Sequence, residues 1–181
     1  VRSSAASDVY KRQAYDAAGK RWLNLRANAV VLACGGYCGI YPVSTNKRDS
    51  GGDGVAMAYE AGAELCDMEF IQFEPSAAVW PRELVGTSVI TTLLFEGAVL
   101  RNRDGERFML RYGPEGDRVS KDVMSRRIVA EIARGKGTEH GGIYMDITGV
   151  DPARLASGYQ MYVQRYRNVG TVSYTHLTLP T

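Results

Sequence analysis

The order of hydrophobic and polar positions in the first half of the chain predicts strands around a single helix. Residues 22–26 alternate between apolar and polar side chains, which is typical of a strand with one face in water. Residues 30–33 form a short apolar run, which predicts a strand buried on both faces. An alanine-rich stretch over 54–65 predicts a helix with Asp53 at its N-cap, and residues 68–74 predict a further strand.

The pattern of apolar residues in the second half of the chain predicts helices between short strands. Residues 99–109 carry an Asp-Gly turn between two strand-like arms, which predicts a hairpin. A helix is expected over 121–133 and a strand over 143–147. Asp151 can cap another helix, with Pro152 in its favoured first-turn position. The apolar faces of these two helices are expected to bury Met124, Ile128 and Ile132, and then Leu155, Tyr159, Val163 and Tyr166.

This mixture of strands and helices indicates an α/β (α+β) fold with two folded parts. A change in composition after Pro75 places a boundary between residues 14–75 and residues 76–171. The flanking segments 1–13 and 172–181 look like translated sequencing-adapter DNA, a known artefact of assembled metagenomic reads, and we exclude them from the fold.

Composition and charge exclude several classes of protein. Without the two end segments the chain has 19 basic and 19 acidic residues, so no charge argument favours nucleic acid or a membrane surface. No run approaches the roughly 18 apolar residues that a membrane-spanning helix needs. Cys34, Cys38 and Cys66 form no CxxC pair, which argues against a disulfide framework and is compatible with a reducing compartment. His140 is the only histidine outside the end segments, so neither a metal site nor a Ser-His-Asp triad is expected.

Two glycine-rich segments carry the strongest chemical signal. The predicted strand at 30–33 runs into paired glycines, and the predicted helix is entered through a second glycine-rich turn. Glycines at such places let the backbone approach a flat or anionic ligand closely. The first segment is Ala33, Cys34, Gly35 and Gly36, and the second is Gly51, Gly52, Asp53 and Gly54.

The order of these two glycine-rich segments resembles that in the flavoprotein subunits of fumarate reductase and succinate dehydrogenase, and in their relative aspartate oxidase. Further segments that match this family lie at 67–72, 97–108, 121–126 and 143–147. The resemblance implies FAD as cofactor. It also implies the last part of a three-layer FAD-binding domain, followed by most of a mixed capping domain. The residues that it assigns to the cofactor are Ala33, Cys34, Gly35, Gly36, Asn46, Gly52, Asp53 and Gly54.

The same resemblance implies that much of the enzyme lies outside this chain. The G-x-G-x-x-G turn that cradles the FAD pyrophosphate does not occur here, and in the family it lies far to the N-terminal side. We therefore expect an internal fragment with an incomplete cofactor site, inactive alone and weak or silent in FAD binding.

The catalytic positions implied by the resemblance differ from the family pattern. In fumarate reductases a hydride passes from flavin N5 to the substrate double bond. The histidine of a Gln-x-His-Pro-Thr segment falls on Glu74, the proton-donating arginine falls on Lys121, and a substrate-holding Thr-Glu pair falls near Ile90 and Thr91. Because a free carboxylate about 4 Å from a substrate carboxylate costs about 4 kcal/mol at an effective dielectric constant of about 20, we expect a substrate other than a standard dicarboxylate. In the plainer alternatives Glu74 turns to solvent and Lys121 is an exposed residue at a helix end.

The expected partners are a small-molecule substrate and an iron–sulfur or other electron-transfer subunit. Neither nucleic acid nor a direct membrane span is expected, and the location is cytoplasmic or membrane-associated through a partner. Three alternatives stay open: a flavin-binding or electron-transfer subunit without catalysis, a truncated inactive product, and a complete small α/β binding protein.

Overall fold

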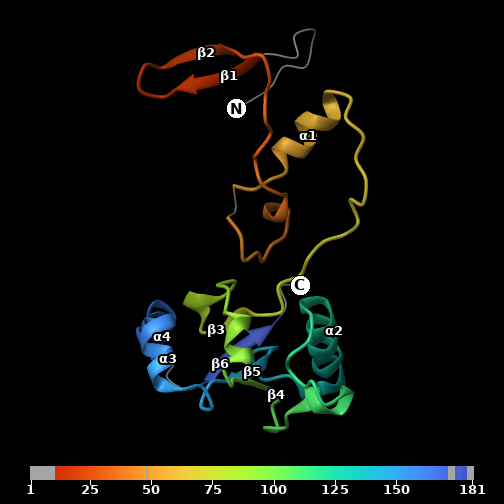
Figure 1. The fold of residues 1–181 in the computed structure, drawn as a ribbon, viewed down its shortest axis with the longest axis vertical. Helices are drawn as coiled ribbons and strands as arrows, with labels where there is room; N and C mark the ends of the chain where they lie inside the picture. The colour runs from red at the N-terminus through yellow and green to blue at the C-terminus, as the bar shows by residue number, and fades with distance from the viewer. Residues whose placement is uncertain (1–10, 48, 171–173, 179–181) are drawn as a thin grey trace. The chain divides into compact units, whose positions relative to one another are not determined.

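The computed structural model describes residues 11–47, 49–170 and 174–178, and the chain divides into two compact units, Val1–Phe70 and Ile71–Thr181 (Figure 1). Both units mix helices with strands, so the fold is mixed α/β. No helix in the described part of the chain is both long and apolar enough to cross a bilayer.

The first unit begins with an antiparallel hairpin. Strands β1 (Lys11–Asp16) and β2 (Arg21–Arg26) pair along their whole length, and β2 matches the strand predicted at 22–26. The Asp16 carboxylate stabilises the turn between them by accepting a hydrogen bond from the Gly19 N–H at 3.0 Å.

Two strands predicted in the first half are not formed. Residues 30–33 have no regular structure, and Val31 is 87 % exposed. Residues 68–74 are likewise irregular, with a turn in which the Phe70 N–H donates to the Asp67 carbonyl. A strand of this kind needs neighbours for its backbone groups, and neither run has a paired strand among the described residues.

The predicted helix at 54–65 forms as α1 (Asp53–Glu60), but it is shorter. Gly52, with φ of 90°, occupies the N-cap, so Asp53 is the first helical residue and the N-cap prediction was wrong by one position. The helix ends before Gly62, whose φ of 89° lies in the left-handed region that suits a helix C-terminus.

The second unit is built on a four-stranded antiparallel sheet in the order β3-β6-β5-β4. In Figure 1 the sheet lies between α2 and the α3–α4 pair. The element bounds are β3 Ala77–Trp80, β4 Val99–Arg101, α2 Lys121–Glu131, β5 Ile143–Asp146, α3 Pro152–Gly158, α4 Gln160–Arg167 and β6 Tyr174–Thr178. Strand β6 lies within the C-terminal segment that was excluded from the predicted fold as an artefact.

The core of this unit contains the predicted apolar face of α2. Met124 and Ile128 of α2 are buried, and Ile132 packs against the same cluster. Of the face predicted for the next helix, Tyr166 is buried and Leu155 and Tyr159 pack against the core, whereas Val163 lines a cavity instead. The helix after Asp151 breaks at Tyr159 into α3 and α4 because Tyr159 is not helical, with φ of −129° and ψ of 19°. Side chains with no exposed surface fill the centre: Leu100, Phe108, Met109, Ile128, Ile143 and Met145.

The predicted hairpin at 99–109 is only half formed. Its first arm is β4, and the Gly105 N–H donates to the Asn102 carbonyl in the expected turn. The second arm instead leads into a short 3-10 helix, Phe108–Tyr112, while β4 pairs with β5. Burial of Phe108 and Met109 in the core explains why this arm leaves the ladder.

Candidate functional site

In the first unit, the two glycine-rich segments are in contact. A Cβ atom placed on Gly54 would lie 2.9 Å from the Cβ of Cys34 and 3.2 Å from its sulfur. One placed on Gly52 would lie 2.9 Å from the Cβ of Tyr37. Only glycine allows the start of α1 to approach residues 34–37 this closely, so the structure brings most of the predicted cofactor residues of this unit together.

The loop that joins these segments is closed by its own hydrogen bonds. The Gly39 N–H donates to the Ser50 carbonyl at 2.9 Å, and the Asn46 side chain donates to the Cys38 sulfur at 3.4 Å. The Tyr37 hydroxyl donates to the Met68 carbonyl at 2.9 Å. Asn46 therefore belongs to the same loop, and Tyr37 joins that loop to the segment at Met68.

The backbone of these segments is open on one side, as an FAD site requires. A Cβ added at Gly36 or Gly51 would meet no atom within 4 Å. Gly35 has a φ of 75°, a conformation that favours glycine. Bare backbone beside the N-terminus of α1 fits a flat ring system or an anionic group, so the residues present fit the implied cofactor.

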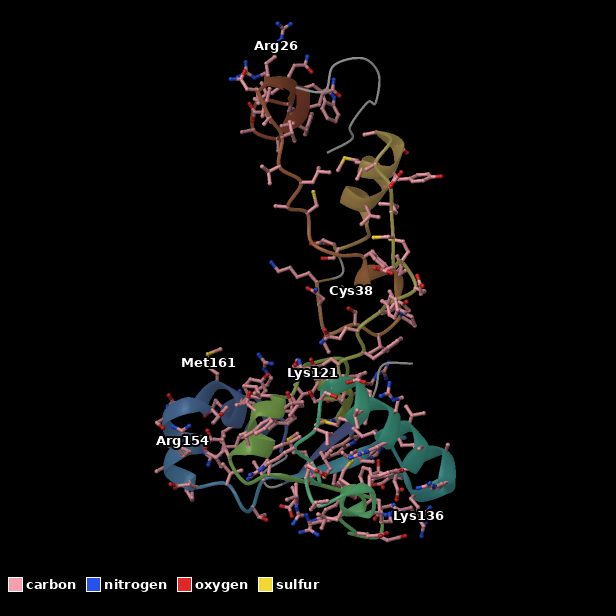
Figure 2. All side chains as sticks on the ribbon, turned by 45° about the vertical axis from the view of Figure 1, so that its right-hand side comes forward. Arg26, Cys38, Lys121, Lys136, Arg154 and Met161 are labelled. Carbon is pink, nitrogen blue, oxygen red and sulfur yellow. The ribbon has the colours of Figure 1, made fainter. Side chains whose placement is uncertain are left out.

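In the second unit, the structure brings Glu74 and Lys121 together. The Lys121 ammonium lies 2.6 Å from Glu74 Oε2, although the two residues are 47 positions apart (Figure 2 labels Lys121). The Glu74 side chain is 18 % exposed and that of Lys121 is 46 % exposed. Glu74 is therefore paired and mostly buried, with one edge still open to water, and the pair carries no net charge when both groups are ionised.

The second oxygen of Glu74 is also bound. The Ser76 hydroxyl donates to Glu74 Oε1 at 2.8 Å, and Ser76 itself is completely buried. One helical turn beyond Lys121, the Ser125 hydroxyl donates to the Phe73 carbonyl at 3.2 Å. Sequence reasoning missed both serines, although a serine two residues after a carboxylate is a spacing that often allows a local hydrogen bond.

Ile90 and Thr91 are linked to this arrangement through a backbone hydrogen bond of the residue before them. They follow Val89, whose N–H donates to the Ser76 carbonyl at 2.7 Å. Thr91 begins a 3-10 helix, Thr91–Phe95, for which Ile90 is the N-cap. The described hydrogen bonds of the Glu74 side chain go to Ser76 and Lys121 and to neither of these residues, so their substrate role stays a prediction.

Tyr162 of α4 is a further neighbour that the sequence analysis did not assign to the site. Its hydroxyl donates to the Ser88 carbonyl at 2.9 Å. Burial raises the pKa of Tyr162 and outweighs the lowering effects of its hydrogen bond to Ser88 and of the Arg165 charge, while the negative charge of Glu74 adds a smaller raising effect. The phenol consequently stays neutral and remains the hydrogen-bond donor to the Ser88 carbonyl.

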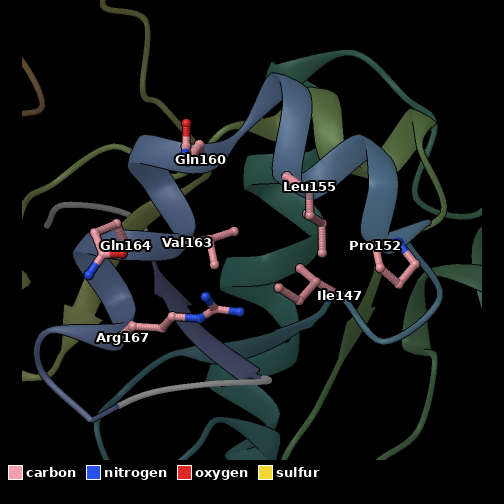
Figure 3. A pocket seen from close by; sticks show the side chains of 8 residues that line it. Ile147, Pro152, Leu155, Gln160, Val163, Gln164 and Arg167 are labelled. Carbon is pink, nitrogen blue, oxygen red and sulfur yellow. The ribbon is translucent and has the colours of Figure 1, made fainter.

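A separate cavity of about 260 Å³ lies beside α3 and α4 (Figure 3). Ile147, Leu155 and Val163 form its apolar wall, and the Arg167 guanidinium points into it. None of the predicted site residues lines this cavity. No group of three or more His, Cys, Asp or Glu side chains in the described ranges could hold a metal ion.

Comparison with known proteins agrees with this geometry. A family model described as "FAD binding domain" matches residues 5–177. One subunit of the fumarate reductase (CoM/CoB) of Methanothermobacter marburgensis is 41 % identical over 145 residues, which is 80 % of this chain and 26 % of that protein. The flavoprotein of mitochondrial succinate dehydrogenase from Xenopus laevis is 38 % identical over 135 residues, covering 73 % of this chain and 20 % of that protein.

A solved structure gives the same result for the fold. A mutant FrdA of Escherichia coli quinol fumarate reductase superposes with a TM-score of 0.77 at 26 % identity, over 89 % of this chain and 30 % of that one. The chain thus spans about a quarter of the length of the curated relatives it matches. On the family model that covers nearly all of its residues, the chain belongs to the FAD-binding-domain family of the fumarate reductase and succinate dehydrogenase flavoproteins.

Proposed function

We propose that this chain is an internal part of a longer FAD-dependent oxidoreductase that transfers a hydride between flavin N5 and an organic substrate. The observation that carries the proposal is the Glu74–Lys121 ion pair. It joins the two positions that the family resemblance assigns to a substrate-holding histidine and a proton-donating arginine. Residues 14–75 then belong to the FAD-binding domain and residues 76–171 to the capping domain.

In this proposal Ala33–Gly36, Asn46 and Gly52–Gly54 hold FAD, which supplies or accepts the hydride when bound. Two observations support this assignment: Gly54 lies in close contact with Cys34, and the backbone of Gly36 has open space beside it. The part of the cofactor site that binds the pyrophosphate belongs to the remainder of the longer protein. The 181-residue chain alone should therefore bind FAD weakly, with no sub-micromolar dissociation constant in a flavin fluorescence titration.

Lys121 is the proton-transfer residue of the proposed reaction. Its ammonium has three N–H donors, of which one is directed at Glu74. The partial exposure of the side chain leaves the others accessible to a substrate. A lysine in this position can protonate the substrate carbon next to the one that receives the hydride.

The substrate differs from a standard dicarboxylate in this proposal. The repulsion expected of an isolated Glu74 is reduced because Lys121 neutralises it. Even so, the family's histidine is replaced by a carboxylate whose two oxygens are already bound, and the Thr-Glu pair by Ile90 and Thr91. The site consequently has fewer free donors for a second carboxylate, which favours a substrate that is neutral at that end.

A second candidate substrate is fumarate itself, which the name of the M. marburgensis relative favours. The two candidates are separated by comparing fumarate with its monomethyl ester as electron acceptors for the reduced, full-length protein. We expect a higher kcat/KM for the monoester. An equal or higher value for fumarate would refute the proposed substrate class.

The role of Lys121 is tested with Lys121→Met in the full-length protein. We expect loss of turnover with normal FAD content, because the shape of the side chain is kept while the proton is removed. Unchanged turnover would refute the proton-transfer role. If the unmodified protein binds FAD but no donor reduces it at a useful rate, the alternative of a non-catalytic flavin-binding protein is supported instead.

The proposed electron-transfer partner is an iron–sulfur subunit. The relative from M. marburgensis is named as one subunit of its enzyme, which makes a multi-subunit assembly reasonable for this chain as well. Co-purification of the full-length protein with the products of neighbouring genes would test this part of the proposal.

A further inference from the structure

We propose that Glu74 returns the proton to Lys121 after each turnover, and that Ser76 is the positioning residue that holds Glu74 for this task. The inference rests on the proposed function of Lys121. It adds a source for the proton and a role for Ser76.

The Glu74 carboxylate is held by a different donor at each oxygen. Oε1 accepts from the Ser76 hydroxyl at 2.8 Å, and Oε2 faces the Lys121 ammonium at 2.6 Å. A distance of this size is short even for a charge-assisted hydrogen bond. Because rotation of the carboxylate would break both contacts, Oε2 stays directed at the lysine.

Ser76 is well suited to a positioning role because its own backbone is held in place. The residue has no exposed surface, and its carbonyl accepts from the Val89 N–H at 2.7 Å. The next residue, Ala77, forms a bridge with Ser88. The Ser76 hydroxyl is therefore presented from ordered backbone rather than from an exposed loop.

The lysine side of the pair is also tied to the Glu74 segment. Lys121 is the first residue of α2, and Ser125 in the next turn donates to the carbonyl of Phe73, the residue before Glu74. Two contacts one helical turn apart thus join α2 to residues 73 and 74. This arrangement keeps the Nζ–Oε2 distance short without relying on the ion pair alone.

The proton balance of the proposed cycle is simple. In the direction of substrate reduction, the Lys121 ammonium gives one proton to the substrate carbon next to the one that takes the hydride, and a neutral amine is left. Glu74 takes one proton from water at its exposed edge and passes it across the 2.6 Å contact to Nζ. The ammonium and the carboxylate are restored, and one solvent proton is consumed per hydride transferred.

The competing possibility is that water recharges Lys121 directly, since the lysine is itself partly exposed. Glu74→Gln separates the two, because glutamine keeps the size of the side chain and an acceptor for Lys121 but cannot carry the proton. In the full-length protein we expect Glu74→Gln to lower kcat by about 100-fold or more, the range of general acid–base catalysis. Formate should partly restore the turnover of Glu74→Ala.

Ser76 is tested by a pair of variants. Ser76→Ala should lower kcat and shift its pH profile, while Ser76→Thr, which keeps the hydroxyl, should restore both. The matched control is Asp104→Asn, which breaks the exposed Lys136–Asp104 pair at 2.5 Å and should leave kcat unchanged.

The contact between Glu74 and Lys121 can also be measured directly, without an activity assay. In protein labelled with ¹⁵N-lysine, the Lys121 ammonium signal should be visible because Glu74 slows its exchange with water. It should be lost in Glu74→Ala and weakened in Ser76→Ala, with Ser76→Thr like the unmodified protein.

The outcomes distinguish this inference from the proposed function. If Lys121→Met abolishes turnover while Glu74→Gln keeps the unmodified kcat and pH profile, the relay is wrong and the role of Lys121 survives. If Ser76→Ala and Ser76→Thr behave alike, Ser76 is not a positioning residue. If Lys121→Met is fully active, the proposed proton-transfer role of Lys121 fails, and the relay fails with it.

Discussion

Replacing Glu131 by glutamine should destabilise the second unit strongly at neutral pH and only weakly in acid. Glu131 is the last residue of α2, the helix that begins with Lys121, and its side chain has no exposed surface. Its Oε1 accepts from the Asn102 amide at 2.8 Å, and its Oε2 forms an ion pair with Arg111. This contact holds the end of α2 against the turn at 102–106.

The magnitude follows from what glutamine cannot replace. The introduced glutamine can accept one hydrogen bond through its carbonyl oxygen, but its –NH₂ then faces a donor on Asn102 or Arg111. The variant loses at least one hydrogen bond that is strengthened by charge, a loss of about 2–3 kcal/mol in the free energy of unfolding. Arg134, 3.6 Å from Glu131 in the native protein, cannot compensate because it too is only a donor.

The pH dependence of this loss has a definite sign. Burial acts to raise the pKa of Glu131, but the hydrogen bonds from Asn102 and Arg111 and the charges of Arg111 and Arg134 outweigh it, so the pKa is lowered in the folded state. The stabilisation is therefore complete above the unfolded-state pKa of about 4.3 and is lost as the pH falls through the lower folded-state value. The difference in stability between the native protein and Glu131→Gln should shrink over the same range.

The assay needs a signal from the second unit alone, since the two units need not unfold together. The chain has two tryptophans, Trp22 in the first unit and Trp80 on β3 in the second. In a Trp22→Phe background, urea unfolding followed by Trp80 fluorescence at neutral pH and at about pH 3.5 gives the two stabilities. Asp104→Asn serves as the control and should leave the unfolding midpoint unchanged at neutral pH. A loss for Glu131→Gln that is equal at both pH values would refute the electrostatic reasoning.

Two further predictions concern local geometry. Gly54→Ala should weaken FAD binding by the full-length protein about tenfold or more, because the new Cβ would overlap Cys34 and overpacking costs about 1–3 kcal/mol. Flavin fluorescence titration measures the loss. The control Gly158→Ala, at a position with open space, should bind FAD normally. Asp151→Ala should lower the free energy of unfolding by about 1 kcal/mol, because the Asp151 carboxylate accepts from the Ala153 N–H at 2.8 Å as the N-cap of α3. The Trp80 signal reports this loss, and Asp151→Asn should recover most of it; equal losses for both variants would contradict the capping role.

The parts of the fold that were predictable are those set by neighbouring residues. The start of α3 follows from a capping aspartate followed by a proline, two local signals that agree. The core face of α2 follows from a four-residue spacing of apolar side chains, which a helix places on one side whatever its surroundings. The strand at 143–147 was confirmed over Ile143–Asp146, where a short apolar run lies in the centre of a sheet.

The parts that failed depend on contacts between distant residues. Residues 30–33 have the composition of a buried strand, but composition does not supply the neighbours that burial requires. In the same way, an Asp-Gly turn after β4 predicts a return strand beside it, whereas the partner of β4 is β5, 43 to 47 residues further along the chain. In the second case local preference yields to pairing and core packing elsewhere, and in the first no partner strand forms among the described residues.

The candidate substrate site shows the same limit with a chemical consequence. From the sequence, Glu74 and Lys121 are two separate departures from the family pattern, and each has its own cost: a carboxylate facing substrate, and a cation at the positive end of a helix. Their 2.6 Å contact makes them a single, neutral unit in which each residue removes the cost of the other. Replacement of either one alone should thus leave an unpaired charge in a partly buried place, so the two positions are expected to tolerate change only together. The charge that a substrate meets at this place is therefore that of the pair, which is zero when both groups are ionised.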